Sequence, residues 1–230
     1  MLKGHLHPIT QFMRHITEVF TKQGFIVAMG PEIETERYNF DFLNMPVDHP
    51  ARDTQDTFWL DDHNLLRTQT TSLQGRLMEK YRPPVRFIMP GKIYRNEATD
   101  LTHEAIFYQI DGFVIDKNVT FTDLLGSLQN VYKSVLGPNI ELRFRPHLFP
   151  FVEPGCEMDL KWKGQWLEML GAGMIHPIVL KNMGLDPNPP AGGWQGFAFG
   201  MGLDRFLMSY YGIEDIRYFH KNDLRFLQQF

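Results

Sequence analysis

Hydrophobic and polar residues follow two periods along this chain, one typical of helices and one typical of strands. In residues 7–25 apolar side chains recur every three or four positions, which predicts a helix with one buried face that ends near Gly24. A second long helix is predicted from Thr120 to Gly137, because Thr120-x-x-Asp123 resembles a capping box. Shorter helices are predicted at 32–44, 72–81, 176–184 and 200–212.

Strand periodicity is strongest in the second half of the chain. In 140–146 and 156–162 apolar side chains alternate with charged ones, as in strands that bury one face of an antiparallel sheet. Residues 85–116 predict a hairpin of two long strands. Further strands are predicted at 25–29, 56–60, 64–71, 164–173 and 196–199. Because no regular strand–helix–strand pattern is present, residues 1–230 are predicted to form one α+β domain, an antiparallel β-sheet flanked by helices.

The hairpin carries more polar residues than a hairpin needs. Its central part reads PGKIYRNEATDLTHEAIFYQIDGF, with Arg95 and Glu97 at the start of the loop. Gln109 and Asp111 lie two apart on the return strand, so both side chains point to one face of it. Solvated decoration of a surface hairpin is the ordinary interpretation, and a ligand site is the alternative. These residues alone leave both open.

Two further stretches are compatible with a binding site. In GFAFGMGLDR a strand meets a helix through Gly200-x-Gly202, which lets backbone approach a ligand closely, and Arg205 follows one turn later. The stretch has neither the third glycine of a dinucleotide fingerprint nor a P-loop, so arginines would have to hold any triphosphate. FPFVEPG, residues 149–155, is either core filling or the wall of a pocket for a flat apolar side chain.

Composition narrows the class of protein. With 43% hydrophobic and 22% charged residues among 230, the chain resembles ordinary globular proteins, and no apolar run reaches the length of a membrane span. Cys156, the single cysteine, excludes an internal disulfide and is expected to be a core thiol, which favours a cytoplasmic location. Nucleic-acid binders usually carry a basic surplus, so at a net charge of −4 any RNA contact must be local or supplied by a partner.

The three polar stretches occur together in one family. HPIT with GPEIE, the hairpin, and GFAFGMGLDRF resemble motifs one, two and three of the class II aminoacyl-tRNA synthetases. DTFWL, LLRTQT, FPFVEP, WLEMLGAGMIHP and YGIEDIRYF sharpen this to the catalytic domain of bacterial-type phenylalanyl-tRNA synthetase alpha subunits. The resemblance covers essentially the whole chain.

The resemblance implies a class II catalytic fold and a ligase activity. It implies ATP-dependent activation of L-phenylalanine to phenylalanyl-adenylate and transfer to tRNA(Phe), with Mg²⁺ as a cofactor. A β subunit, or a second copy of the chain, is the expected partner of the motif-one face, and no membrane is involved. The alternative is a catalytically silent class II-like paralogue that binds an amino acid or pairs with a subunit.

Family roles for the nucleotide fall on matching positions of this sequence. Arg95 is similar to the arginine that bridges the amino-acid carboxylate and the α-phosphate. Phe107 is expected to stack on adenine, with Arg205 on the other face and reaching the γ-phosphate. The remaining positions that the resemblance assigns to ATP or Mg²⁺ are Glu97, His103, Gly202 and, for the metal, Glu168.

Family roles for the amino acid fall on other segments. The phenyl pocket is expected at Phe149, Phe151, Val152 and Ala198, and the ammonium site, with Trp59 near the carboxylate, at Gln69, Thr71, Gln109 and Asp111. Thr71 stands where the family usually has Ser, and Asp111 where it usually has Glu.

The ends of the sequence also suggest an expectation. The chain begins almost at motif one, and the resemblance therefore implies that the family's N-terminal coiled coil is missing, as in a truncated or reconstructed subunit. No anticodon-binding module follows Phe230, which disfavours the mitochondrial monomeric form. We expect activation to survive in such a core and tRNA charging to be weak.

Overall fold

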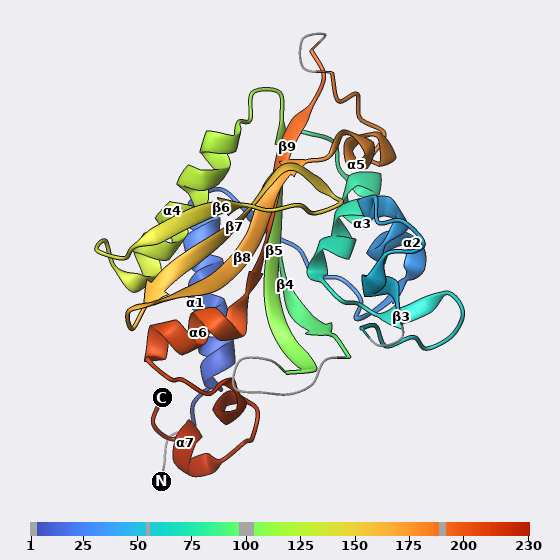
Figure 1. Ribbon diagram of the computed structural model, residues 1–230. Helices are drawn as coiled ribbons and strands as arrows, with labels where there is room; N and C mark the ends of the chain where they lie inside the picture. Colours follow the sequence, from blue (N-terminus) through green and yellow to red (C-terminus); the bar gives the residue numbers. More distant parts are fainter. Residues whose placement is uncertain (1–3, 54–55, 97–103, 189–191) are drawn as a thin grey trace.

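The predicted sheet is present in the computed structural model, which describes residues 4–53, 56–96, 104–188 and 192–230 (Figure 1). Its seven strands have the order β1-β4-β5-β9-β8-β7-β6. Every neighbouring pair is antiparallel except β1 and β4, which run parallel. The bounds are β1 Ile26–Val27, β4 Val85–Tyr94, β5 Ile106–Asp116, β6 Leu142–Pro146, β7 Val152–Trp162, β8 Gln165–Ile175 and β9 Gln195–Gly202. The predicted α+β class is therefore confirmed, and the parallel edge pair is an addition to it.

Three helices cover one face of this sheet: α1 (Pro8–Lys22), α4 (Phe121–Leu136) and α6 (Leu203–Tyr211). The predicted apolar stripe of α1 makes the contact, and Phe20 stacks on Phe199 of β9 with ring centroids 5.3 Å apart. The predicted capping box begins α4. These helices and the strands behind them enclose the larger hydrophobic core.

A smaller group of elements packs against the other face. It contains α2 (Glu36–Asn39), α3 (Leu73–Lys80) and α5 (Pro177–Asn182), with a two-stranded sheet of β2 (Ile33–Thr35) and β3 (Asn64–Leu66). Because successive strand residues point to opposite faces, neighbouring residues of β5 and β9 contribute to different cores. The remaining short elements are η1 Asp41–Leu43, η2 Pro50–Arg52, η3 Thr70–Ser72, η5 Ile216–Phe219 and α7 Leu224–Leu227.

The helix predicted at 32–44 is wrong over most of its length. Its first residues form β2, only Glu36–Asn39 are α-helical, and the turn η1 follows until Asn44, which has a φ of 59°. Pairing of β2 with β3 satisfies backbone groups of this segment across the small sheet. Tertiary pairing therefore overrides the local helical pattern.

Several predicted strands are also shorter or longer than expected. The strand predicted at 64–71 ends at Leu66, because the turn η3 leads directly into α3, and 56–60 contributes only an isolated bridge between Trp59 and Leu65. The strand predicted at 25–29 is reduced to β1. In contrast, β9 continues through Gly202.

The extension of β9 corrects the helix predicted at 200–212. Gly200 and Gly202 are strand residues that pair with Asp111 and Gln109 of β5, so α6 begins only at Leu203. Among the helices of the described segments, none is long and apolar enough to cross a membrane.

Candidate active site

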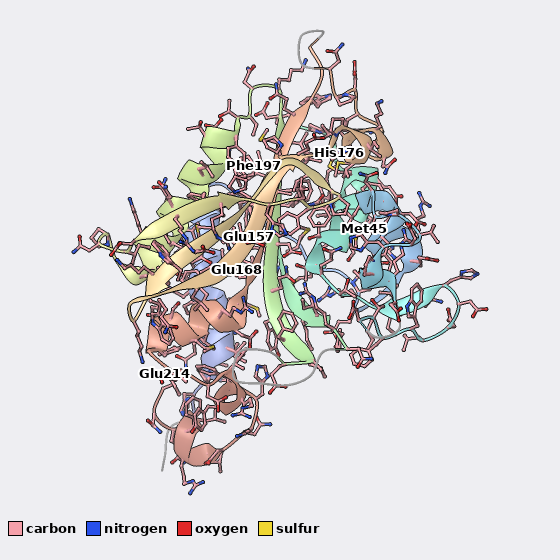
Figure 2. All side chains as sticks on the ribbon, viewed as in Figure 1. Met45, Glu157, Glu168, His176, Phe197 and Glu214 are labelled. Atoms are coloured by element: carbon pink, nitrogen blue, oxygen red, sulfur yellow. The ribbon has the colours of Figure 1, made fainter. Side chains whose placement is uncertain are left out.

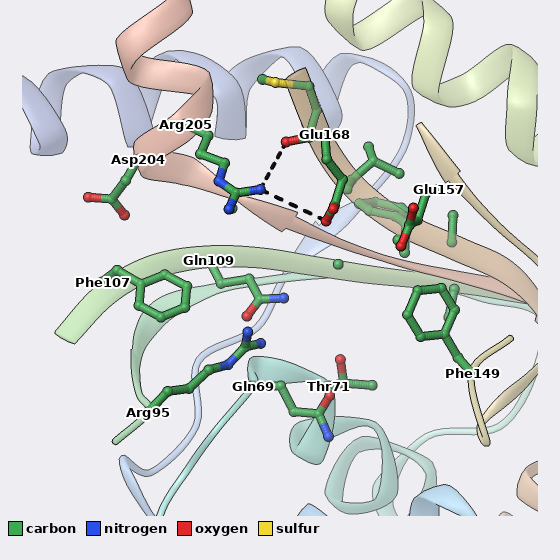
Figure 3. Close-up of a pocket in the computed structure, with 18 of the residues that line it drawn as sticks. Gln69, Thr71, Arg95, Phe107, Gln109, Phe149, Glu157, Glu168, Asp204 and Arg205 are labelled. Carbon is green, nitrogen blue, oxygen red and sulfur yellow. Dashed lines mark hydrogen bonds and ion pairs between the residues drawn. The ribbon is translucent and has the colours of Figure 1, made fainter. Parts of the chain in front are cut away.

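A cavity of about 400 Å³ opens on the face of the sheet opposite α1 and α4 (Figure 3). Its floor comes from β5, β9, β8 and β7, and its rim from the turn before α3 and the start of α6. Figure 2 shows two acidic residues on this open face, Glu157 on β7 and Glu168 on β8. The central strands of the sheet therefore contribute residues to both hydrophobic cores and to the cavity.

A cross-strand row of residues forms the floor of the cavity. Glu157 pairs with Gly171, Gly171 with Gly200, and Gly200 with Asp111, so the row places two glycines between two carboxylates. A Cβ atom on Gly171 would lie 2.7 Å from the Phe149 ring. A Cβ atom on Gly200 would lie 2.8 Å from Nε2 of Gln109 and 3.0 Å from Oδ1 of Asp111. A side chain at either position would therefore displace residues that line the cavity.

Two residues of β5 that pair with the glycines of β9 each carry a buried acceptor atom. Asp111 is fully buried, and its Oδ2 accepts hydrogen bonds from the backbone N–H of Thr71, at 2.6 Å, and from the Thr71 hydroxyl. Within the described segments, Oδ1 of Asp111 and Oε1 of Gln109 have no hydrogen-bond partner. Buried acceptors normally have donors, so this corner is suited to a ligand cation with several N–H groups.

Burial also changes the acidity of this corner. Desolvation raises the pKa of Asp111 to about 6, against hydrogen bonds from Thr71 and Thr70 and the charge of Arg95, which lower it. A carboxylate with this pKa is mostly ionised at pH 7, and the described residues form no ion pair with it. An ammonium group at Oδ1 would favour the ionised form.

Two arginines lie at the other end of the cavity. The guanidinium of Arg95 lies 5.3 Å from the ring centroid of Phe107, and its Nε donates to the carbonyl of Thr68 at 3.2 Å. Arg205 donates from Nη1 to the Glu168 carbonyl at 3.2 Å, with the Glu168 carboxylate 3.9 Å away. Figure 3 shows Phe107 and Gln109 between the two guanidiniums. This end can bind an anion with a flat ring attached.

The apolar end is built by the stretch that the sequence left ambiguous. The rings of Phe149 and Phe151 stack with centroids 5.6 Å apart, and Val152 and Ala198 are buried beside them. Both interpretations of this stretch, pocket wall and core filling, are correct. Its side chains line the cavity and also pack against the smaller hydrophobic core. A flat apolar side chain is accommodated here.

Most predicted site residues converge on one place. Those that line the cavity are Gln69, Thr71, Arg95, Phe107, Gln109, Phe149, Phe151, Val152, Glu168, Ala198, Gly202 and Arg205. Asp111 lies beneath the floor, and Trp59 is not part of the lining, because its indole N–H donates to the Arg52 carbonyl at 3.1 Å. Glu97 and His103 lie outside the described residues. The individual roles stay predictions.

Three carboxylates of the lining were not predicted: Glu104, Glu157 and Asp204. Glu157 lies 2.7 Å from Arg145 and 3.0 Å from His147 in ion-pair contacts. On its strand it alternates with apolar residues, as a solvated residue does, so the pattern gave no sign of the cavity. Asp204, in contrast, stands beside Arg205 in the third motif, and this position could have drawn attention to it.

Glu168 is the residue to consider for a metal. Among residues that the structure describes, no group of three His, Cys, Asp or Glu side chains could hold an ion. Mg²⁺ that travels with a nucleotide needs only one or two protein carboxylates besides the phosphates. The carboxylate of Glu168 is 51% exposed at the cavity, which fits such a metal and does not fit an all-protein cage.

Comparison with known proteins identifies the family. Residues 1–230 match the family described as tRNA synthetases class II core domain (F). The chain is 47% identical over 239 residues to the phenylalanine–tRNA ligase alpha subunit of Clostridium acetobutylicum, across 99% of this chain and 69% of that relative. It is 50% identical over 228 residues to the protein of the same name from Thermosynechococcus vestitus, across 99% and 66%. The chain belongs to this family.

The resemblance drawn from the motifs is thereby confirmed: the chain is a class II synthetase core of the phenylalanine–tRNA ligase alpha-subunit type. It spans about two thirds of the length of the curated relatives that it matches. A pyrrolysyl-tRNA synthetase from Desulfitobacterium hafniense superposes with a TM-score of 0.72, covering 95% of this chain and 75% of that one at 19% identity. That similarity supports the class II fold.

Proposed function

We propose that the cavity binds L-phenylalanine and ATP side by side and that the chain catalyses formation of phenylalanyl-adenylate. The observation that carries this proposal is the combination of groups at the cavity. Gln109 and Asp111, whose buried Oε1 and Oδ1 have no hydrogen-bond partner in the described segments, pair with Gly202 and Gly200 of the floor. The apolar Phe149–Val152 segment and the two arginines line the same cavity. An α-amino acid supplies an ammonium for the acceptors and an apolar side chain for the Phe149–Val152 segment, and a nucleotide supplies phosphates for the arginines.

The amino acid would lie over the glycine strip. Its ammonium would donate to Asp111 and Gln109, and its ring would extend across Gly171 towards Phe149 and Ala198. In this pose the substrate ammonium forms an ion pair with Asp111, which is buried and already accepts a hydrogen bond from Thr71. The carboxylate of the substrate would then point to Arg95.

ATP would occupy the arginine end, with its base on Phe107. Activation is an attack by the amino acid's carboxylate oxygen on the α-phosphorus, which forms a mixed anhydride as the bond to pyrophosphate breaks. The nucleophile is already ionised, so no general base is needed. Arg95 and Arg205 orient the phosphates and stabilise the charge that develops on their oxygens. Bound Mg²⁺ would neutralise phosphate charge, with Glu168 as its protein ligand.

Transfer to tRNA(Phe) is the second part of the proposal, and it needs a partner. The relatives are named as alpha subunits, which implies a second kind of subunit, and the net charge of −4 offers no general attraction for RNA. Ile26 of the edge strand β1, Met29 of the segment after it and Ile33 at the start of β2 are exposed, at 60%, 73% and 56%. We propose this motif-one face as the surface for a β subunit or, without one, a second copy of the chain.

Phenylalanine-dependent exchange of pyrophosphate into ATP tests the activation step. The purified chain, alone or with a β subunit, should catalyse exchange that requires phenylalanine. Absence of exchange in both preparations would overturn the proposal and favour the silent paralogue. Both arginines are retained, which argues for the enzyme, and ATP should raise the melting temperature of the chain but not of an Arg205→Ala variant.

A further inference from the structure

A buried carboxylate connects the nucleotide end of the cavity with the C-terminal segment of the chain. Asp204, the second residue of α6, is 2% exposed. Its Oδ2 accepts a hydrogen bond from the backbone N–H of Tyr108 in β5 at 2.7 Å. Its Oδ1 lies 2.8 Å from Nε2 of His220, which directly follows the turn η5. Both oxygens are therefore engaged, one by the floor of the cavity and one by an imidazole.

The bond to Tyr108 lies where the nucleotide is expected. Tyr108 stands between Phe107 and Gln109, which both line the cavity, and Asp204 itself precedes Arg205. One carboxylate thus fixes the strand position that carries the adenine-stacking ring and the helix position that carries a phosphate-binding arginine. His220 is outside the cavity lining that the described residues form.

We propose that His220 is a positioning residue for ATP, which acts by holding Asp204 against the Tyr108 N–H. The inference rests on the proposed function and deepens it. A misplacement of about 1 Å, even one caused far from the reacting atoms, can cost ~10²-fold, so a residue that fixes β5 relative to α6 influences the nucleotide without touching it. If the imidazole is removed, the buried Oδ1 loses its donor, and only the Tyr108 N–H still holds the carboxylate in place.

The charged groups around His220 make this contact dependent on pH. Asp204 faces it from α6, His7 from the residues before α1, and Glu104 from the segment before β5. Burial alone would disfavour the imidazolium, but the hydrogen bond to Asp204 and the charges of Asp204 and Glu104 raise the pKa of His220. Burial and the charge of His220 lower the pKa of His7. Of these two imidazoles, His220 therefore holds its proton more tightly than His7.

The direction of the pH effect follows from that raised pKa. The ion pair of His220 with Asp204 is fully present below the pKa of an unfolded histidine. It is lost as the pH rises through the higher pKa of the folded protein. ATP affinity should therefore weaken on the alkaline side in a His220-dependent way.

Two variants of this residue separate the hydrogen bond from the charge. His220→Leu removes both, whereas His220→Gln keeps an N–H donor that does not titrate. His63→Gln, in an exposed turn, is the matched control. ATP dissociation constants are measured by calorimetry near pH 6.5 and near pH 8.5. The Michaelis constants for ATP and phenylalanine come from pyrophosphate exchange.

The expected result is a selective loss at the nucleotide. His220→Leu should weaken ATP affinity roughly tenfold at the lower pH, as for a lost charge-assisted hydrogen bond, and leave the Michaelis constant for phenylalanine unchanged. His220→Gln should restore most of the ATP affinity and abolish the extra pH dependence. The control should match the unmodified chain throughout.

Other results overturn the inference. Unchanged ATP affinity in His220→Leu, or equal losses for ATP and phenylalanine, would reduce His220 to a residue of general stability. A His220→Gln variant as impaired as His220→Leu would do the same. Failure of the proposed function is distinguishable, because an unmodified chain that binds ATP in a His220-dependent way but shows no exchange would refute catalysis and retain the positioning role.

Discussion

The amino-acid end and the nucleotide end of the cavity are built in different ways. At the amino-acid end the groups are buried and fixed by packing: Asp111 is fully buried, and Val152 and Ala198 are 3% and 6% exposed. At the nucleotide end long side chains extend into solvent, with 25% of the Arg205 side chain and 51% of the Glu168 side chain exposed. The amino-acid end is preformed, whereas the charged side chains of the nucleotide end can rearrange around a ligand.

This difference predicts which substitutions should affect binding of the amino acid and which should affect the rate. A preformed apolar pocket distinguishes substrates by shape, so changes there should alter the affinity for phenylalanine. Exposed cations act on charge that develops during the reaction, so changes there should alter the rate more than the binding of the amino acid. Four substitutions test whether the two ends have these separate roles, and those with larger expected effects come first.

Arg95→Ala should have the largest effect. Loss of the guanidinium removes a donor aimed at the α-phosphate and at the carboxylate of the amino acid. We expect the exchange rate to fall by ~10²–10³, and the affinity for phenylalanine to fall less than the rate. Steady-state exchange and phenylalanine titration measure the two quantities. Arg82→Ala, on the exposed segment before β4, serves as the control. A large loss of phenylalanine affinity with a normal rate would contradict the division of roles.

Gly200→Ala should act on the opposite end. A Cβ there would press on Gln109 and Asp111, and overpacking of about 1–3 kcal/mol predicts a roughly tenfold to hundredfold loss of phenylalanine affinity. ATP affinity should be retained. Gly126→Ala in α4, where an added Cβ meets nothing within 4 Å, controls for the substitution itself. Equal losses for both substrates would show that the two ends are not independent.

Asp111 should make the amino-acid end sensitive to pH. Its pKa of about 6 lies above that of an unfolded aspartate, so the folded state binds the proton more tightly. The free energy of unfolding should therefore fall by about 3 kcal/mol as the pH rises from ~4 to ~6, and Asp111→Asn should remove this slope. Denaturant titrations across this range measure it. An unchanged slope in the variant would place the titration elsewhere.

Phenylalanine binding should show the opposite dependence on pH. The ammonium group requires ionised Asp111, so affinity should rise as the pH passes through about 6, and Asp111→Asn should be weak at every pH. ATP affinity should not follow this profile, because the Asp111 carboxylate is expected to contact the amino acid and not the nucleotide.

Tyr132→Phe should have the smallest effect. It tests whether every buried polar atom without a hydrogen-bond partner marks a ligand site. The Tyr132 hydroxyl is buried without a hydrogen-bond partner in the described part of the chain, as are Gln109 Oε1 and Asp111 Oδ1, but it lies in the larger core. Its removal keeps the stacking on Phe206 and should stabilise the fold by up to about 1 kcal/mol without altering exchange. A destabilised or inactive variant would show that the hydroxyl has a role.

Sequence reasoning located the site through residues with distinctive chemistry. Arg95, Phe107, Gln109 and Arg205 stand in motifs whose spacing specifies them, and alternation specified the long strands. The neighbours that complete the site could not be found in this way. Gly200 was predicted to let backbone approach a ligand, but Gly171 gains meaning only from its pairing with Gly200, and a single sequence does not state strand register.

The errors have the same origin. The helical pattern of 32–44 competes with pairing to β3, and the two-residue β1 depends on a partner strand far along the chain. Asp204 and His220 lie sixteen residues apart, and no local pattern links a carboxylate in a helix with an imidazole after a turn. Local periodicity therefore predicts elements well and their pairing poorly.

Binding of a non-hydrolysable phenylalanyl-adenylate analogue tests the central claim most directly, because that molecule spans both ends at once. Calorimetry should show the analogue binding at least ~10²-fold more tightly than phenylalanine or ATP alone, as expected for a ligand that resembles the product of the activation step. Its affinity should fall in both Gly200→Ala and Arg95→Ala. An analogue that binds no more tightly than either substrate, or that is insensitive to one of these substitutions, would contradict a single site with two ends.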